Sequence, residues 1–165
     1  MSAPELRFVS APLPVGHAVY SAQDRALTYQ HVAPPSCSPE QALRAEIQEI
    51  GFFAGRCGLI FRRQERDLVR IEAYTDKQNW SLTESLSVPA VAGEGVVTLV
   101  TPTESHAIRI GPDPQYTYSA QRNSLLVTFG DATCPYFRVS SNLLVALNAE
   151  SRLVAAYIEN MAICA

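Results

Sequence analysis

The feature that most constrains the fold is a series of short apolar runs, separated by turn-like segments, that continues through most of the chain. Within residues 68–75, for example, Val69 and Ile71 alternate with Arg70 and Glu72. A period of two is typical of a β-strand with one face in the core and the other in solvent. Similar runs occur before and after this one, so we expect about eight to ten strands. The connections are short, which favours antiparallel pairing.

One segment has the pattern of a helix. Ser38 is a capping residue, Pro39 suits the first helical position, and Gln41 stands three residues after the cap. Gly55 is a typical residue at the end of a helix. The sequence therefore predicts an amphipathic helix over residues 39–54, packed on a sheet face, and an α+β class that is mostly β. Its apolar stripe would comprise Leu43, Ile47, Ile50 and Ala54.

The end of the chain, residues 142–161, contains two apolar runs around a short polar break. Both faces of each run are apolar, as Leu143 and Leu144 illustrate for the first. Such strands are typical of the middle of a sheet that is covered on both sides. We expect this hairpin to close the core and to bind no ligand.

Size and charge limit the class of protein. The chain has 165 residues, which predicts a single domain over residues 1–165. The formal charge of −3, from 13 basic and 16 acidic residues, argues against a nucleic-acid partner. No apolar run reaches the ~18 residues of a membrane span, and the first residues lack the pattern of a secretory signal. We therefore expect a cytoplasmic protein with no membrane partner.

The sequence offers no catalytic or metal-binding motif. His17, His31 and His106 are too widely spaced for a compact zinc site, and no base accompanies a recognisable nucleophile. We therefore expect no catalytic residues, no metal and no cofactor. The four cysteines have no C-x-x-C spacing, so we expect all of them to be free thiols. They are Cys37, Cys57, Cys134 and Cys164.

A tryptophan in a polar segment marks the most interesting stretch. Trp80 is the only tryptophan and lies within residues 72–84, which have no apolar period. It is either a lid over the core or an exposed anchor at an interface, and both readings stay open. A second polar segment with tyrosines spans residues 111–123. The predicted partner-binding residues are Glu72, Tyr74, Asp76, Trp80, Tyr116 and Tyr118.

Five arginines form the densest charged feature, and acidic residues are interleaved with them. A mixed-charge hairpin tip usually keeps a surface soluble, which is the role expected here. These arginines are Arg56, Arg62, Arg63, Arg66 and Arg70.

The C-terminal hairpin resembles the ending of several small bacterial proteins, among them immunity proteins encoded beside polymorphic or contact-dependent toxins. The similarity covers residues 143–161, where a Leu-x-Val strand is followed by a Leu-Val-x-x-x-Ile strand. It departs from the pattern at the turn, residues 148–152, which has no glycine. The resemblance implies a non-catalytic protein that neutralises a toxin by occluding it, and it carries over no site residue.

Two other functions stay open. One is a small enzyme or ligand-binding β-protein whose site is assembled from distant residues. The other is a structural subunit of a larger assembly. The sequence does not indicate the oligomeric state.

Overall fold

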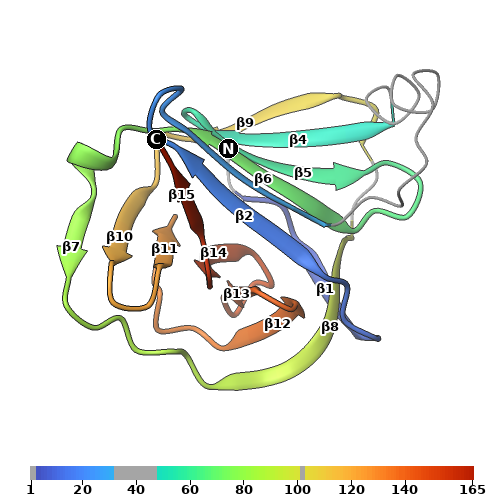
Figure 1. The fold of residues 1–165 in the computed structure, drawn as a ribbon. Helices are drawn as coiled ribbons and strands as arrows, with labels where there is room; N and C mark the ends of the chain where they lie inside the picture. Colours follow the sequence, from blue (N-terminus) through green and yellow to red (C-terminus); the bar gives the residue numbers. More distant parts are fainter. Residues whose placement is uncertain (1–2, 32–47, 101–102) are drawn as a thin grey trace.

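The computed structural model describes residues 3–31, 48–100 and 103–165, and these form two β-sheets (Figure 1). The eight-stranded sheet contains, in spatial order, β1 (Leu6–Ser10), β8 (Val91–Leu99), β12 (Tyr136–Ser140), β13 (Leu143–Leu147), β14 (Leu153–Ile158), β11 (Ser124–Thr128), β10 (Gln115–Ser119) and β7 (Ser81–Thr83). The seven-stranded sheet contains β15 (Ala162–Cys164), β2 (Gly16–Ser21), β3 (Ala26–His31), β6 (Leu68–Tyr74), β5 (Cys57–Arg62), β4 (Glu49–Ala54) and β9 (Ala107–Gly111).

Both sheets are mixed, and together they contain fifteen strands in the described part of the chain, so the expectation of antiparallel sheets with about eight to ten strands is wrong. Four neighbouring pairs are parallel: β7 with β10, β8 with β12, β2 with β15, and β4 with β9. The cause is the path of the chain, which moves from one sheet to the other between successive strands. For example, β9 belongs to the seven-stranded sheet, although β8 and β10 both belong to the eight-stranded sheet.

The predicted helix over residues 39–54 is also wrong where the structure describes it. Glu49–Ala54 is strand β4, which pairs antiparallel with β5, and the earlier part of the predicted helix lies outside the described residues. Among the described residues the only helical element is a short 3-10 helix, η1 (Lys77–Asn79), so no amphipathic helix packs on a sheet there. The class is therefore nearly all β and not α+β.

Two glycines explain why this segment is a strand. Gly51 in β4 and Gly58 in β5 both lie beneath the ring of Phe53, since a Cβ atom at either position would approach that ring to 2.5 and 2.7 Å respectively. Glycine is unfavourable within a helix, whereas in a paired strand it leaves room for a neighbouring aromatic ring. The β4–β5 hairpin thus packs around Phe53.

The main hydrophobic core joins the two sheets. One buried cluster contains Leu27 and Ile71 of the seven-stranded sheet together with Leu125 and Val145 of the eight-stranded sheet. Because all four side chains are almost completely buried, this shared core stabilises the packing of one sheet on the other. Within the described part of the chain, no helix is long and apolar enough to span a membrane.

The C-terminal hairpin lies in the middle of the eight-stranded sheet, as predicted. Every residue of β13 and β14 is buried. The inner face joins the main core, while the outer face forms a second cluster that includes Leu144 and Tyr157 and is covered in part by Leu86. The expectation that both faces are covered is therefore confirmed.

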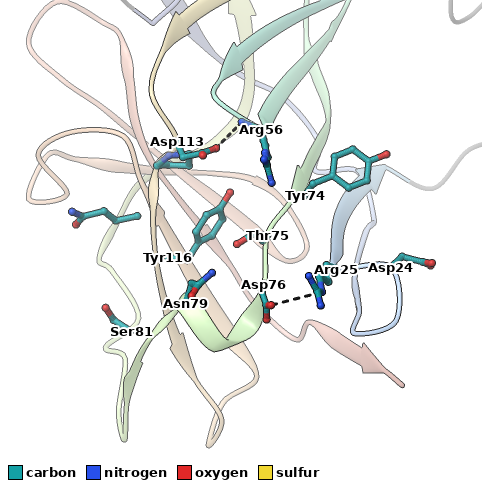
Figure 2. Close-up of a pocket in the computed structure, with 12 residues that line it drawn as sticks. Asp24, Arg25, Arg56, Tyr74, Thr75, Asp76, Asn79, Ser81, Asp113 and Tyr116 are labelled. Carbon is teal, nitrogen blue, oxygen red and sulfur yellow. Dashed lines mark hydrogen bonds and ion pairs between the residues drawn. The ribbon is translucent and has the colours of Figure 1, made fainter.

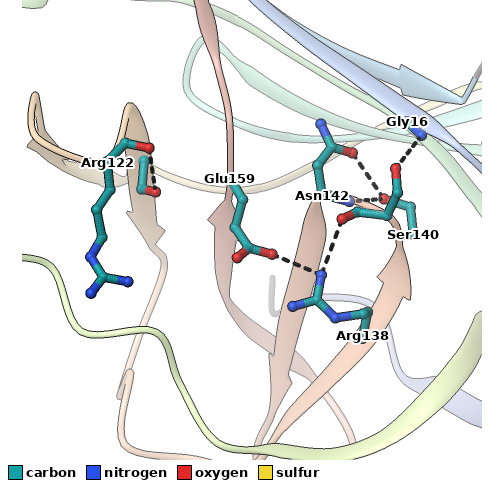
Figure 3. A network of polar contacts seen from close by, with 8 residues as sticks. Gly16, Arg122, Arg138, Ser140, Asn142 and Glu159 are labelled. Carbon is teal, nitrogen blue, oxygen red and sulfur yellow. Dashed lines mark hydrogen bonds and ion pairs between the residues drawn. The ribbon is translucent and has the colours of Figure 1, made fainter.

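Polar contacts hold the open end of this hairpin (Figure 3). Arg138 of β12 donates a hydrogen bond of 2.7 Å to the carboxylate of Glu159, which follows β14. The hydroxyl of Ser140 donates to the side-chain oxygen of Asn142 at 3.1 Å. The backbone N–H of Gly16 donates to Ser141 Oγ at 3.1 Å, which connects the hairpin end to β2 in the other sheet.

Candidate functional site

An open cleft lies at the end of the seven-stranded sheet, where several connections meet. It has a volume of about 1110 Å³. The β2–β3 turn, the β4–β5 turn, the end of β6 and the β9–β10 connection all contribute to it (Figure 2). The residues that line this cleft are Asp24, Arg25, Arg56, Tyr74, Thr75, Asp76, Asn79, Ser81, Asp113, Pro114, Gln115 and Tyr116.

A tight turn places Arg56 on the cleft wall. Gly55 and Arg56 join β4 to β5, and Gly55 has a φ of +58°, a conformation that favours glycine. The Gly55 N–H donates to the carbonyl of Gly111 at 2.8 Å. The Arg56 N–H donates to Asp113 Oδ1 at 2.6 Å. The β9–β10 connection is therefore docked on the hairpin tip.

Trp80 is buried behind this wall and is only 5% exposed. Its ring centroid lies 4.7 Å from that of Tyr20, 5.7 Å from that of Tyr118 and 6.0 Å from that of Tyr116, on which it stacks. The indole N–H donates to Thr75 Oγ1 at 2.9 Å. The burial of the indole agrees with the first interpretation of Trp80, a lid over the core, because an exposed anchor would be accessible to solvent. Its role in partner binding stays a prediction.

Hydrogen bonds also fix the segment between β6 and β7. The hydroxyl of Tyr20 donates to the carbonyl of Thr75 at 3.0 Å and accepts from the Lys77 N–H at 2.9 Å. Asp76 Oδ1 accepts from the Gln78 N–H at 3.0 Å, which caps η1. The carboxylate of Asp76 also lies 3.7 Å from the guanidinium of Arg25. This side of the cleft is thus held by its own polar groups.

The six residues predicted for the partner surface separate into three groups. Tyr74, Asp76 and Tyr116 line the cleft. Trp80 and Tyr118 lie in the aromatic cluster behind it. Glu72 does not line the cleft; its carboxylate accepts from Arg70 at 3.1 Å on β6.

Sequence reasoning missed the lining residues that come from distant turns, including Asp24, Arg25 and Asp113. The Pro-Asp-Pro sequence of residues 112–114 signals a turn, but nothing local indicates which other turns it approaches. The sequence analysis groups Arg56 with the other arginines, yet Arg56 lies in the β4–β5 turn directly before β5, whereas Arg62 is at the far end of β5. Because a strand separates them, the five arginines do not form one hairpin tip.

Two titratable side chains, Cys57 and Tyr116, lie against each other near the cleft. Burial raises the pKa of the Cys57 thiol to about 12, so this thiol stays protonated at neutral pH. Tyr116, whose hydroxyl lies against it, also has its pKa raised by burial. Among the residues that the structure covers, no three or more His, Cys, Asp and Glu side chains are grouped as metal ligands.

The thiols at Cys57, Cys134 and Cys164 are free, as predicted for them. Cys37 lies outside the described residues, so its expected free thiol stays a prediction.

No model of a known protein family matches the chain, and no curated protein is similar to it in sequence at a significant level. The resemblance of the C-terminal hairpin to immunity proteins therefore stays a prediction.

Proposed function

We propose that the chain is a non-catalytic protein-binding module that contacts its partner through the cleft. In its most specific form, the proposal is an immunity protein that neutralises a bacterial toxin by occluding it. One observation carries the proposal: Tyr74 is 69% exposed at the rim of a cleft whose wall is backed by the buried ring of Trp80. Aromatic side chains on a pre-organised surface are typical of the residues that dominate binding at interfaces.

The composition of the cleft favours a protein over a small apolar ligand. Small-molecule pockets are lined predominantly by hydrophobic and aromatic side chains. Here most of the lining side chains carry charged, amide or hydroxyl groups, and two tyrosines and two arginines are among them. Tyrosine and arginine are enriched at protein–protein interfaces. The open shape also allows a protruding segment of a partner to enter (Figure 2).

Capture from an extract of the native host, with matched variants, tests the proposal. Tyr74→Ala removes the exposed ring, while Leu82→Ala changes a side chain that is 73% exposed on β7 and does not line the cleft. We expect at least one protein to be retained by the wild type and by Leu82→Ala but not by Tyr74→Ala. Its affinity should fall by roughly 2 kcal/mol in Tyr74→Ala.

The toxin-neutralising form needs a further measurement. Co-expression of the captured protein with the wild-type chain should restore growth that the captured protein alone prevents, and co-expression with Tyr74→Ala should not. Equal retention of every captured protein by the wild type and Tyr74→Ala would exclude the cleft as the contact surface. A partner whose activity is unchanged by the chain would exclude the immunity function.

A further inference from the structure

Arg56 differs from the other charged side chains of the cleft. The aspartates at 24, 76 and 113 each accept a hydrogen bond from a neighbouring group, and Arg25 pairs with Asp76. None of the hydrogen bonds or ion pairs among the described residues involves the guanidinium of Arg56. Its five N–H donors therefore lie in the cleft and have no hydrogen-bond acceptor among the residues that the structure describes.

The backbone of Arg56 is held on both sides. Its N–H donates to Asp113 Oδ1 at 2.6 Å, and its carbonyl accepts from the Tyr74 N–H at 3.2 Å. In Figure 2 the side chain extends from the hairpin tip toward Thr75, with Tyr74 on one side and Tyr116 on the other. Because the backbone is already fixed, binding of a ligand by the side chain costs no further backbone entropy at this position.

Further donors line the same cleft. The side-chain amides of Asn79 and Gln115 and the hydroxyl of Tyr74 make no hydrogen bond with another described residue. The chain has a formal charge of −3, which opposes an acidic partner at long range, but salt screens exposed charges beyond about 8 Å. The three aspartates of the cleft carry negative charge, so a carboxylate from a partner would have to contact the guanidinium of Arg56 directly.

We infer that Arg56 binds the side-chain carboxylate of an aspartate or glutamate in an extended segment of the partner protein. Tyr74 packs against the partner residues that flank this acidic residue. Arginine suits this role because its planar guanidinium matches a carboxylate with two parallel hydrogen bonds. The inference rests on the proposed function and specifies the chemistry of the partner segment.

Selection from displayed random peptides tests this inference without knowledge of the natural partner. The full-length chain is used as bait in three forms: the wild type, Arg56→Met, and Arg7→Met as a control for loss of an exposed arginine on β1, far from the cleft. One library presents the peptides internally and another presents free C-termini. Melting curves of all three baits establish that the variants are folded.

The wild type and Arg7→Met should select internal peptides with Asp or Glu at one preferred position, and Arg56→Met should not. Replacing that residue by Asn or Gln should weaken binding about tenfold or more, as expected for hydrogen bonds between charged groups. Arg56→Lys should recover only part of the affinity, because lysine lacks the planar fork.

Three results would overturn the inference: no acidic preference, the same preference with Arg56→Met, or selection only of free C-termini. Tyr74→Ala then separates this failure from that of the proposed function. If selected peptides bind Arg56→Met as well as the wild type but do not bind Tyr74→Ala, the cleft remains the binding surface and only the role of Arg56 is excluded. Peptides that are indifferent to both changes, or no selected peptides at all, count against the cleft itself.

Discussion

The C-terminal hairpin lies in the middle of the eight-stranded sheet, whereas the cleft opens at the end of the seven-stranded sheet, and the two regions differ in what surrounds them. Every residue of β13 and β14 is buried, and apolar clusters cover both faces. Near one edge of the eight-stranded sheet, Tyr116 and Tyr118 of β10 pack against Trp80, and Tyr116 also lines the open cleft. One region is defined by apolar packing and the other by aromatic rings, of which Tyr20, Trp80 and Tyr118 form hydrogen bonds through their polar atoms.

If the proposed function holds, stability depends mainly on the hairpin and binding on the cleft. In the hairpin, the free energy of unfolding depends on buried aliphatic area, which tolerates no polar group without a partner. In the cleft, buried Trp80 and Tyr20 hold the segment between β6 and β7, while Tyr74 and Arg56, the proposed binding residues, are exposed. Mutations that separate these two roles test the comparison.

The largest effect is expected for thiol reactivity behind the cleft. Because burial raises the pKa of Cys57 to about 12, its thiolate fraction at pH 8 should be about a thousandfold below that of an unperturbed thiol. Exposed Cys164 should react with a maleimide much faster than Cys57, as measured by mass spectrometry over time. In denaturant, four alkylated cysteines are expected. Equal native rates at Cys57 and Cys164 would mean that the cleft region opens readily.

The next largest effect is expected for Trp80→Ala. The change removes a nearly buried indole and its three aromatic contacts, and it should lower the free energy of unfolding by roughly 4 kcal/mol. Denaturant titration measures the loss, and Trp80→Phe should recover part of it. A loss below about 1 kcal/mol, together with weakened partner binding, would instead identify Trp80 as an interface anchor.

Leu144→Ala tests the hairpin. Leu144 is fully buried in the outer cluster, so its truncation should cost about 3 kcal/mol through lost burial and a cavity. Folded protein should still bind the partner with unchanged affinity, because the cleft is not altered. Leu82→Ala, at a largely exposed position, should change stability by less than about 0.5 kcal/mol. A loss of affinity in folded Leu144→Ala would mean that the two regions are coupled.

The smallest effect is expected for Tyr116→Phe. The Tyr116 hydroxyl is buried against the Cys57 thiol and has no conventional hydrogen-bond partner among the described residues. Its removal should change stability by less than about 1 kcal/mol and could increase it, because an unsatisfied polar atom is lost. Thermal melting measures the shift. A clear destabilisation would show that the hydroxyl makes a productive contact in solution.

Much of the strand content could be predicted from local alternation. The wet face of β6 was expected from the alternation of Val69 and Ile71 with charged residues, and the central position of β13 and β14 followed from their two apolar faces. The strand β4 was mistaken for a helix because Ile50 and Ala54 fit both a helical and an alternating pattern. What decides between them is the contact of Phe53 with Gly58 on β5, which no local pattern contains.

The cleft was only partly predictable. The segment after β6 stood out because Trp80 lies among polar residues, and Tyr74, Asp76 and Tyr116 were named for the same surface. The ring of Tyr20 packs on Trp80, but it comes from β2 and carries no sign of this role in the sequence. Arg56 and Asp113 meet only because β9 pairs with β4, a parallel pairing that alternation along one strand does not reveal.

The parallel pairs also bear on the order in which the chain folds. The β13–β14 hairpin closes a short loop, whereas the pairing of β4 with β9 and the contact of Tyr20 with Trp80 join segments that are far apart in sequence. Closing long loops costs more entropy, and folds rich in such contacts reach their transition state slowly. A chain refolding from denaturant should therefore acquire its hairpin core before its cleft. An intermediate trapped at that stage would be compact, inactive in binding and prone to associate through strand edges that are not yet paired.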